Sequence, residues 1–286
     1  MNNMPEIWFP NIGIKIDELS RVAFNLFGID IYWYGVIIGT GIIISLFLGL
    51  YEVKRTKQNA EVYMDFVLIA MFVCILCARI YYVIFSWDYY SNHINEIFAI
   101  RNGGLAIYGG ILGGLLTAII YTKVKKLNFW LFADTVIPSL LLGQVIGRWG
   151  NFVNREAFGG YTNSLFALRY MKNQVSNIPE SIMNNIVNIN GVEYIQVQPT
   201  FLYESFWNFC LFIVLIILKN KKKFDGQIFG IYILGYALGR VWIEGLRTDQ
   251  LIIGSTGIPV SQLLSIIFII VGIVILYLRN KNSIKL

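Results

Sequence analysis

Residues 147–160 read Gly147-Arg148-Trp149-Gly150-Asn151-Phe152-Val153-Asn154-Arg155-Glu156-Ala157-Phe158-Gly159-Gly160, and an apolar run at 128–147 leads into them. An apolar run of about 20 residues is long enough to cross the hydrocarbon core of a bilayer as a helix. The fourteen quoted residues include two arginines, two asparagines, one glutamate and four glycines. Each polar group at a membrane boundary needs a partner or water. The stretch therefore indicates a transmembrane helix that ends in a functional polar segment.

This polar segment has the composition of an anion-binding turn. Arg148 offers a planar guanidinium that can hold a phosphate through two parallel hydrogen bonds, and the glycines let the backbone approach a ligand closely. Asn151 and Asn154 can donate their amides to the same oxygens or to neighbouring carbonyls. Composition alone also allows a polar helix cap and loop that binds nothing.

The composition of the whole chain is typical of a polytopic membrane protein. Of its 286 residues, 56% are hydrophobic and 15% are aromatic, which exceeds the apolar fraction of a soluble domain. The net charge is +6, but the basic residues lie in short clusters between apolar runs. That arrangement favours a lipid bilayer over nucleic acid as the partner. The three cysteines are too few for a disulfide scaffold.

Seven apolar runs predict an all-α fold with seven transmembrane helices. We expect a single membrane domain over residues 1–286, in which residues 1–30 form an interfacial arm and residues 148–198 a small head on the outer face. The arm lacks the pattern of a cleaved signal peptide, and Trp8, Phe9, Phe24 and Phe27 are its expected membrane anchors. The expected helix limits are 31–51, 63–86, 103–122, 128–147, 199–218, 227–246 and 258–278.

Clusters of lysine and arginine predict how these helices are oriented. The clusters lie at 54–57, 123–126, 219–223 and 279–285, which places them on one side of a seven-helix alternation. Short cytoplasmic loops carry an excess of basic residues. We therefore expect the C-terminus in the cytoplasm, and the N-terminus and residues 148–198 outside.

The segment at 147–159 resembles the signature Gly-Arg-x-Gly-Asn-Phe-x-Asn-x-Glu-x-x-Gly of prolipoprotein diacylglyceryl transferases at every fixed position. Members of that family are integral enzymes of the bacterial cytoplasmic membrane, and they move diacylglycerol from phosphatidylglycerol to the thiol of a prolipoprotein's lipobox cysteine. The resemblance implies a transferase of lipoprotein biosynthesis. We find no carboxylate cluster suited to Mg²⁺ and expect no metal or cofactor.

Two early motifs extend the resemblance. The first apolar run opens with Trp33-Tyr34-Gly35, which implies a place for Tyr34 in the active cavity, although an aromatic belt at the interface is the simpler reading. The second run contains Ala-Arg-x-x-Tyr-Val around Arg79. The family places this arginine in the polar interior, and the alternative is a side chain that snorkels to the outer interface.

Residues 102–114 contain a departure from the family pattern. Tyr108 stands where many members carry a histidine proposed as catalytic, and Gln198 replaces a second histidine before Pro199. The only histidine, His93, lies in a polar loop, so a histidine base at position 108 is excluded. A tyrosine can donate a hydrogen bond to phosphate or thiol, but with an ordinary pKa of about 10 it is a poor base unless a cation lowers that value.

The last motifs add charged residues to the predicted site. Residues 198–204 resemble the family's His-Pro-Thr/Ser-x-Leu-Tyr-Glu, and Glu204 is expected to hold an arginine in place. Tyr236, Arg240 and Glu244 follow at intervals of four and therefore share one helix face. This spacing resembles the family's Tyr-x-x-x-Arg-x-x-x-Glu-x-x-Arg. The alternative is an Arg–Glu clamp between helices.

The chemistry implied by the resemblance assigns roles to these residues. A thiolate attacks the glyceryl carbon, and the leaving glycerol phosphate develops negative charge that arginines in a low-dielectric pocket can stabilise. The proton acceptor stays open between Glu244, a tyrosine and the phosphate. A transporter for a small anionic or lipid substrate is the rival function, because buried charges and glycine-broken helices also suit a substrate path. We predict Arg148, Arg240 and Tyr108 as catalytic residues. The predicted substrate-binding residues are Arg148, Asn151, Asn154, Glu156, Gly159, Tyr34, Arg79, Glu204, Tyr236 and Glu244.

Overall fold

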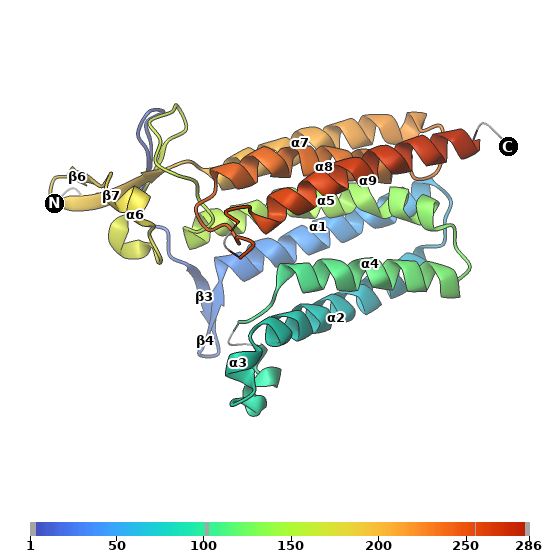
Figure 1. Ribbon diagram of the computed structural model, residues 1–286, viewed down its shortest axis with the longest axis horizontal. Coiled ribbons are helices and arrows are strands. Elements are labelled where there is room, and N and C mark those ends of the chain that lie inside the picture. The colour runs from blue at the N-terminus through green and yellow to red at the C-terminus, as the bar shows by residue number, and fades with distance from the viewer. Residues whose placement is uncertain (1–3, 101–102, 255, 284–286) are drawn as a thin grey trace. The chain divides into compact units, whose positions relative to one another are not determined.

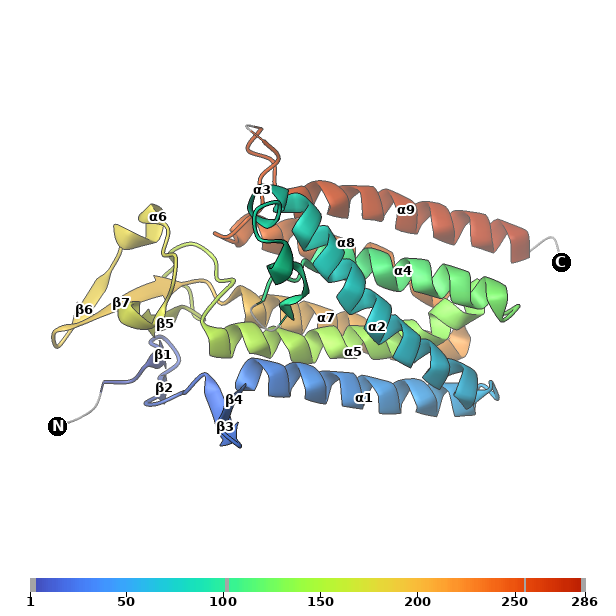
Figure 2. The same ribbon diagram turned by 90° about the horizontal axis from the view of Figure 1, so that it is seen from below.

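The computed structural model describes residues 4–100, 103–254 and 256–283, so Asn102 and Lys285, which the sequence motifs include, lie outside it. Helices make up most of the described chain (Figures 1 and 2). The chain divides into two compact units, Met1–Leu48 with Val136–Leu286, and Gly49–Thr135. We describe each unit separately.

Helices dominate both units. The long helices are α1 (Trp33–Arg55), α2 (Ala60–Phe85), α4 (Ile107–Val124), α5 (Phe129–Asn154), α7 (Thr200–Leu218), α8 (Gln227–Leu246) and α9 (Val260–Ser283). The short ones are α3 (Trp87–Tyr90), η1 (Ile94–Phe98), η3 (Lys172–Gln174), α6 (Glu180–Met183) and η4 (Lys219–Lys221).

Six helices of the described chain are long and apolar enough to cross a membrane, namely α1, α2, α4, α5, α7 and α9. The chain is therefore a multi-pass membrane protein. The remaining long helix, α8, occupies the predicted 227–246 but is not among the six. It carries the charged Arg240 and Glu244 within its 20 residues.

The end of α5 differs from the prediction. The sequence analysis ended this helix at 147, but it continues to Asn154 and includes half of the polar segment. Phe152 and Val153 belong to a buried core, which holds this last turn in place. The helix stops where Arg155 adopts a left-handed backbone with φ 56°, a common way to end an α-helix.

The N-terminal arm and the head share a β-sheet that the all-α prediction omitted. The strands are β1 (Ile7–Phe9), β2 (Ile14–Ile16), β5 (Leu168–Met171), β6 (Val187–Ile189) and β7 (Val192–Val197), in the order β2-β1-β5-β7-β6. Ile7 pairs with Tyr170 across β1 and β5. Strands of three to six residues that pair across such a distance in sequence leave little periodic signal.

The head also has a hydrophobic core, although its sequence showed no core pattern. The core draws on the arm, on the end of α5 and on the sheet, so no one segment contains the pattern. Its buried members are Ile7, Phe9, Phe152, Val153, Phe158, Leu168, Tyr170, Ile182, Ile195, Val197 and Phe201.

The structure changes the expected membrane anchors of the arm. Phe9 is buried in the head core, and the Trp8 ring lies under the cations of Lys15 and Arg169, at 4.9 and 4.8 Å. Phe24 and Phe27 remain exposed. They lie on a hairpin of β3 (Val22–Leu26) and β4 (Ile29–Tyr32), which leads into α1 (Figure 1).

In the second unit, α2 packs closely against α4. A Cβ at Gly109 would collide with the Cys77 carbonyl, and one at Gly113 would lie 2.8 Å from the Cys77 Cβ. The absence of side chains at these two glycines therefore lets the two helix backbones lie close together.

Candidate active site

The site in the first unit centres on one carboxylate that binds two arginines. Glu204, on α7, is 3% exposed. Its Oε1 lies 2.5 Å from Arg148 Nη2, and its Oε2 accepts a hydrogen bond of 2.8 Å from Arg240 Nη1. Arg148 comes from α5 and Arg240 from α8. The two predicted phosphate ligands therefore lie together, on helices that the sequence alone could not pair.

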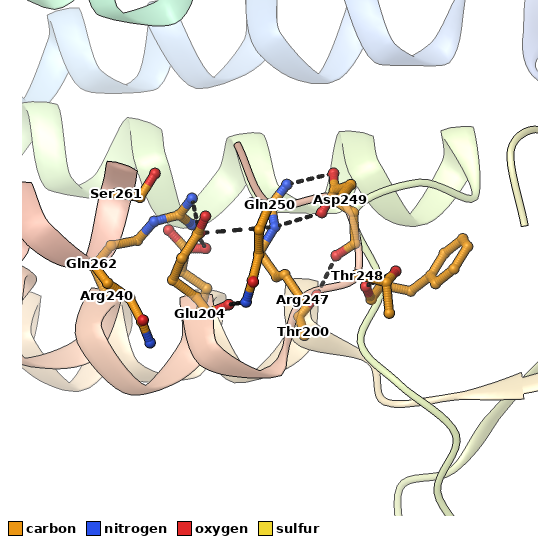
Figure 3. A network of polar contacts seen from close by, with 12 residues as sticks. Thr200, Glu204, Arg240, Arg247, Thr248, Asp249, Gln250, Ser261 and Gln262 are labelled. Atoms are coloured by element: carbon orange, nitrogen blue, oxygen red, sulfur yellow. Dashed lines mark hydrogen bonds and ion pairs between the residues drawn. The ribbon is translucent and has the colours of Figure 1, made fainter. Parts of the chain in front are cut away.

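The cluster continues along α8 towards its C-terminal end (Figure 3). Arg240 Nη2 lies 2.5 Å from Glu244 Oε2, and Arg247 Nε lies 4.0 Å from the same oxygen. Arg247 then donates from Nε and Nη2 to the two oxygens of Asp249, at 2.9 and 2.7 Å. Three arginines thus face three carboxylates, and the formal charges of this set cancel.

Burial and ion pairing have opposite effects on the pKa values of Arg247 and Asp249. Burial alone would raise the pKa of the Asp249 carboxyl, but the hydrogen bonds and charge of Arg247 outweigh it and hold that pKa below its ordinary value. Burial alone would lower the pKa of Arg247, and Asp249 outweighs it and raises that pKa. Both groups are therefore charged at neutral pH.

Two tyrosines of α8, Tyr236 and Tyr232, lie next to the charged cluster. Tyr236 lies beside Arg148, Glu204 and Arg240, and its ring stacks on Tyr232 with 5.8 Å between the centroids. Gln144, on α5, donates a hydrogen bond of 3.0 Å to the Tyr232 hydroxyl. The shared face predicted for Tyr236, Arg240 and Glu244 is therefore the face that meets α5 and α7.

The polar side chains at the end of α5 form a second chain of contacts that begins at Arg148. Arg148 Nη1 donates to Asn151 Oδ1 at 3.5 Å, and Asn151 Nδ2 donates to Glu156 Oε1 at 2.9 Å. Asn154 Nδ2 donates to the same Glu156 oxygen at 3.4 Å. The fixed polar positions of this segment thus contact one another directly.

Tyr34 lies against this chain from α1. Its ring packs on Gly150, where a Cβ would stand 2.8 Å from Tyr34 Cδ2. Its hydroxyl is close enough to Glu156 and Arg148 for their charges to act on it. The structure therefore brings Tyr34, Arg148 and Glu156 together.

Gly159 packs closely against the backbone of two other segments of the chain. Its N–H donates to the Gln198 carbonyl at 2.9 Å, and the next N–H, of Gly160, donates to the Leu246 carbonyl at 3.2 Å. A Cβ at Gly159 would lie 2.8 Å from the Leu246 oxygen. This glycine allows the segment that follows α5 to run between the start of α7 and the end of α8.

Arg79 belongs to the second unit and is 5% exposed there. Its guanidinium donates to four backbone carbonyls at 2.6 to 2.9 Å, those of Glu96, Ile97, Gly103 and Gly104. These bonds hold the four carbonyls around the guanidinium and bury the charge, so Arg79 does not snorkel to water. Tyr108 lies in the first turn of α4, in the same unit.

Two groups of functional interest lie outside the set of predicted site residues. Arg247 and Asp249 were not among the predicted site residues, although Arg247 stands three residues after Glu244 in the same motif. Arg155 was read only as part of a polar turn. It is buried, and its Nη2 donates to Glu6 Oε2 at 2.8 Å and to the Leu19 carbonyl at 2.7 Å. Burial lowers the pKa of Arg155, and Glu6 is too distant in sequence to have signalled this pair.

The chain is similar to known proteins over nearly its whole length. Residues 21–278 match the model of a family described as prolipoprotein diacylglyceryl transferase. The phosphatidylglycerol–prolipoprotein diacylglyceryl transferase of Clostridioides difficile is 45% identical over 266 residues, which cover 93% of this chain and 98% of that protein. The proteins of the same name from Listeria welshimeri and Bacillus licheniformis are 44% identical over 273 residues and 45% identical over 268 residues. These matches cover 95% and 93% of this chain, and 94% and 95% of the two relatives.

Proposed function

The chain belongs to the prolipoprotein diacylglyceryl transferase family, and we propose that it transfers the diacylglyceryl group of phosphatidylglycerol to the thiol of a prolipoprotein's lipobox cysteine. It is a membrane-bound transferase of lipoprotein biosynthesis, and nothing observed supports the rival transporter function. The observation that carries the mechanism is the meeting of Arg148 and Arg240 on Glu204.

The proposed reaction is a displacement at carbon. The cysteine thiol gives up its proton, which ends on the phosphate of the leaving group, and its sulfur forms a bond to the glyceryl carbon that carries the phosphate oxygen. The carbon–oxygen bond breaks, and glycerol phosphate leaves with the electron pair. Its charge grows in the transition state, where fixed donors stabilise it more than they stabilise the bound lipid.

Arg148 and Arg240 are the proposed donors to that phosphate. Each guanidinium carries five N–H groups, so each arginine has further hydrogen-bond donors beyond those that contact the carboxylates. Glu204 binds both arginines and fixes the direction of two planar groups from different helices. We assign Glu204 a positioning role, and Glu244 the same role towards Arg240.

The remaining predicted residues have proposed roles around this centre. Tyr34 and Tyr236 are proposed to contact the head group or the thiol, and Tyr108 is proposed as a hydrogen-bond donor in place of the family's histidine. The Asn151, Asn154 and Glu156 chain shapes the outer end of the site. Arg79 contributes indirectly, through the segment that its carbonyl contacts hold.

We further propose seven spans in a single membrane domain of the bacterial cytoplasmic membrane, with the N-terminus outside and the C-terminus in the cytoplasm. α8 has 20 residues, and such a helix is about 30 Å long. Arg279, near the end of α9, donates to the Asp225 carbonyl between α7 and α8 at 3.0 Å. Two basic clusters therefore meet at one end of the helices, as an alternating chain with a cytoplasmic C-terminus requires.

A transfer assay tests the proposed function. Purified protein is incubated with phosphatidylglycerol labelled in the glycerol unit that carries the acyl chains, because mild alkali removes the ester-linked chains themselves, and with a peptide that contains the lipobox cysteine. We expect label on the peptide in a thioether that resists mild alkali, with release of glycerol phosphate. A peptide in which serine replaces that cysteine is the control. Absence of label on the cysteine peptide would contradict the proposal.

A further inference from the structure

An open cleft lies beside the β3–β4 hairpin and the start of α1. Figure 1 shows how this hairpin leads into the helix. Its volume is about 640 Å³, which is within the range of roughly 300 to 1,000 Å³ that ligand pockets have. The hairpin, the start of α1, the residues around the end of α5 and one loop of the head supply its walls. Arg21, Tyr32, Gly35, Asn154, Glu156 and Ser176 are among the lining residues.

The cleft adjoins the candidate active site through Tyr34. This side chain lines the cleft, and the charges of both Arg148 and Glu156 act on its hydroxyl. Its ring also packs on Gly150 in the last turns of α5. A ligand in the cleft would therefore lie next to the residues that hold the lipid phosphate in the proposed function.

The chemistry of the lining does not suit acyl chains. Arg21, Asp30 and Glu156 bring charges of both signs to the walls, and an acyl chain laid against them would desolvate these groups without replacing their hydrogen bonds. The outward faces of α1 are apolar instead, with Ile43 and Phe47 exposed. The lipid tails therefore have a better environment along the helices than in this cleft.

An extended polypeptide suits the same lining. The backbone of such a chain needs donors and acceptors along its length. β4 contributes Ile31 and Tyr32 to the cleft, and among the described strands it pairs with β3 alone. One edge of β4 thus pairs with no described strand, and addition of a strand to a free edge is a common mode of peptide recognition.

We propose that this cleft binds the acceptor polypeptide in an extended conformation, with its cysteine directed past Tyr34 towards the arginine pair. The inference rests on the proposed function and assigns the second substrate to a surface of its own. Arg21, Gly35 and Ser176 become recognition residues for the acceptor.

Gly35 on α1 and Ser176 in a loop of the head both line the cleft, so a larger side chain at either position should narrow it. No atom lies within 4 Å of a Cβ built on Gly35, and Ser176 is exposed, so a larger side chain starts in open space at either position. Gly35→Leu and Ser176→Leu should each raise KM for the peptide roughly tenfold, which corresponds to about 1.4 kcal/mol of lost binding free energy. KM for phosphatidylglycerol and kcat at saturating peptide should stay unchanged.

Two matched control variants test whether the effect on KM is specific to the cleft. Gly39 lies one turn further along α1, also with nothing within 4 Å of a built Cβ, and Ser181 is an exposed serine of α6 in the head. Neither lines the cleft. Gly39→Leu and Ser181→Leu should leave both KM values at those of the unmodified protein.

The outcomes distinguish failure of this inference from failure of the proposed function. An unmodified protein that transfers no label contradicts the function itself. An active protein whose Gly35 and Ser176 variants keep the KM for peptide, or raise only the KM for lipid, contradicts the cleft assignment. If Gly35→Leu lowers the melting temperature, photo-cross-linking tests the cleft assignment instead. For this test a benzophenone amino acid is placed at position 176. It should cross-link to the peptide, the same probe at 181 should not, and absence of a cross-link at 176 would overturn the inference.

Discussion

The ring of Tyr34 lies on Gly150 so closely that a methyl group on Gly150 would stand 2.8 Å from Tyr34 Cδ2. This contact joins α1 to the last turns of α5 and sets the distance between the Tyr34 hydroxyl and Arg148. The glycine in the fourth position of the polar segment is therefore required by a neighbouring side chain.

Gly150→Ala should displace Tyr34 and lower the transfer rate. Crowding in a packed contact costs about 1–3 kcal/mol, so the melting temperature should fall as well. Gly160→Ala is the matched control, because no atom lies within 4 Å of a Cβ built there. The measurements are thermal unfolding and the transfer assay. Unchanged activity in Gly150→Ala would mean that the position of Tyr34 does not matter to the reaction.

Arg148→Ala and Arg240→Ala should each lower the transfer rate by about two orders of magnitude or more, the size expected for loss of one donor to a developing oxyanion. Lysine should restore only part of the rate, because a point charge cannot replace the planar guanidinium. The assay is run with each variant in the same lipid composition, after its melting temperature has been measured.

The Arg–Glu clamp makes a different prediction for Arg240. Arg240→Ala leaves the buried Glu244 without this partner and should reduce stability. In the clamp reading, Arg240→Ala combined with Glu244→Ala recovers both stability and activity. We expect the double variant to recover stability alone. A stable and active double variant would remove Arg240 from the catalytic set.

Tyr108→Phe should lower the transfer rate and leave the melting temperature unchanged, because only a hydrogen-bond donor is lost. Tyr108→His should keep more activity than the phenylalanine variant, since the resemblance places a histidine at this position in many members. The comparison needs both variants in one series of rate measurements. Full activity in Tyr108→Phe would leave Tyr108 a packing role only.

The Arg247–Asp249 pair should make stability depend on acid pH. The folded pKa of Asp249 is depressed, so the contribution of the pair is fully present above the unfolded value of about 3.9 and is lost as pH falls through the folded value. The melting temperature of Asp249→Asn should therefore lie below that of the unmodified protein at pH 7, and the gap should close on acidification. If the difference between the two melting temperatures stays constant with pH, the charge of Asp249 contributes nothing to stability.

Cysteine labelling in intact cells tests the orientation. In a variant without Cys74, Cys77 and Cys210, a membrane-impermeant maleimide should label Asn184→Cys in the head and should label Lys281→Cys only after the cells are permeabilised. The physical reason is the alternation of basic clusters with seven spans. Labelling of both positions in intact cells would contradict the seven-span topology, and α8 would then be the helix that does not cross.

The sequence by itself determined the helices, because apolar runs of about 20 residues are a local property of the chain. It also pointed to Arg148, Arg240 and Glu204, which the structure brings together in the first unit. Tyr236, Arg240 and Glu244 share a helix face by spacing alone, and the fixed positions of 147–159 pointed to Arg148. The predicted end of α5 was seven residues short, since burial of Phe152 and Val153 in the head extends this helix.

Only the tertiary structure decided which residues meet. Glu204 joins Arg148 to Arg240 across three helices, Arg155 finds Glu6 at a separation of 149 residues, and β1 enters a sheet with strands of the distant head. None of these pairs is marked in the sequence. Each forms because separate segments bury their apolar surface together, and the partner of a polar side chain then depends on where that burial places it.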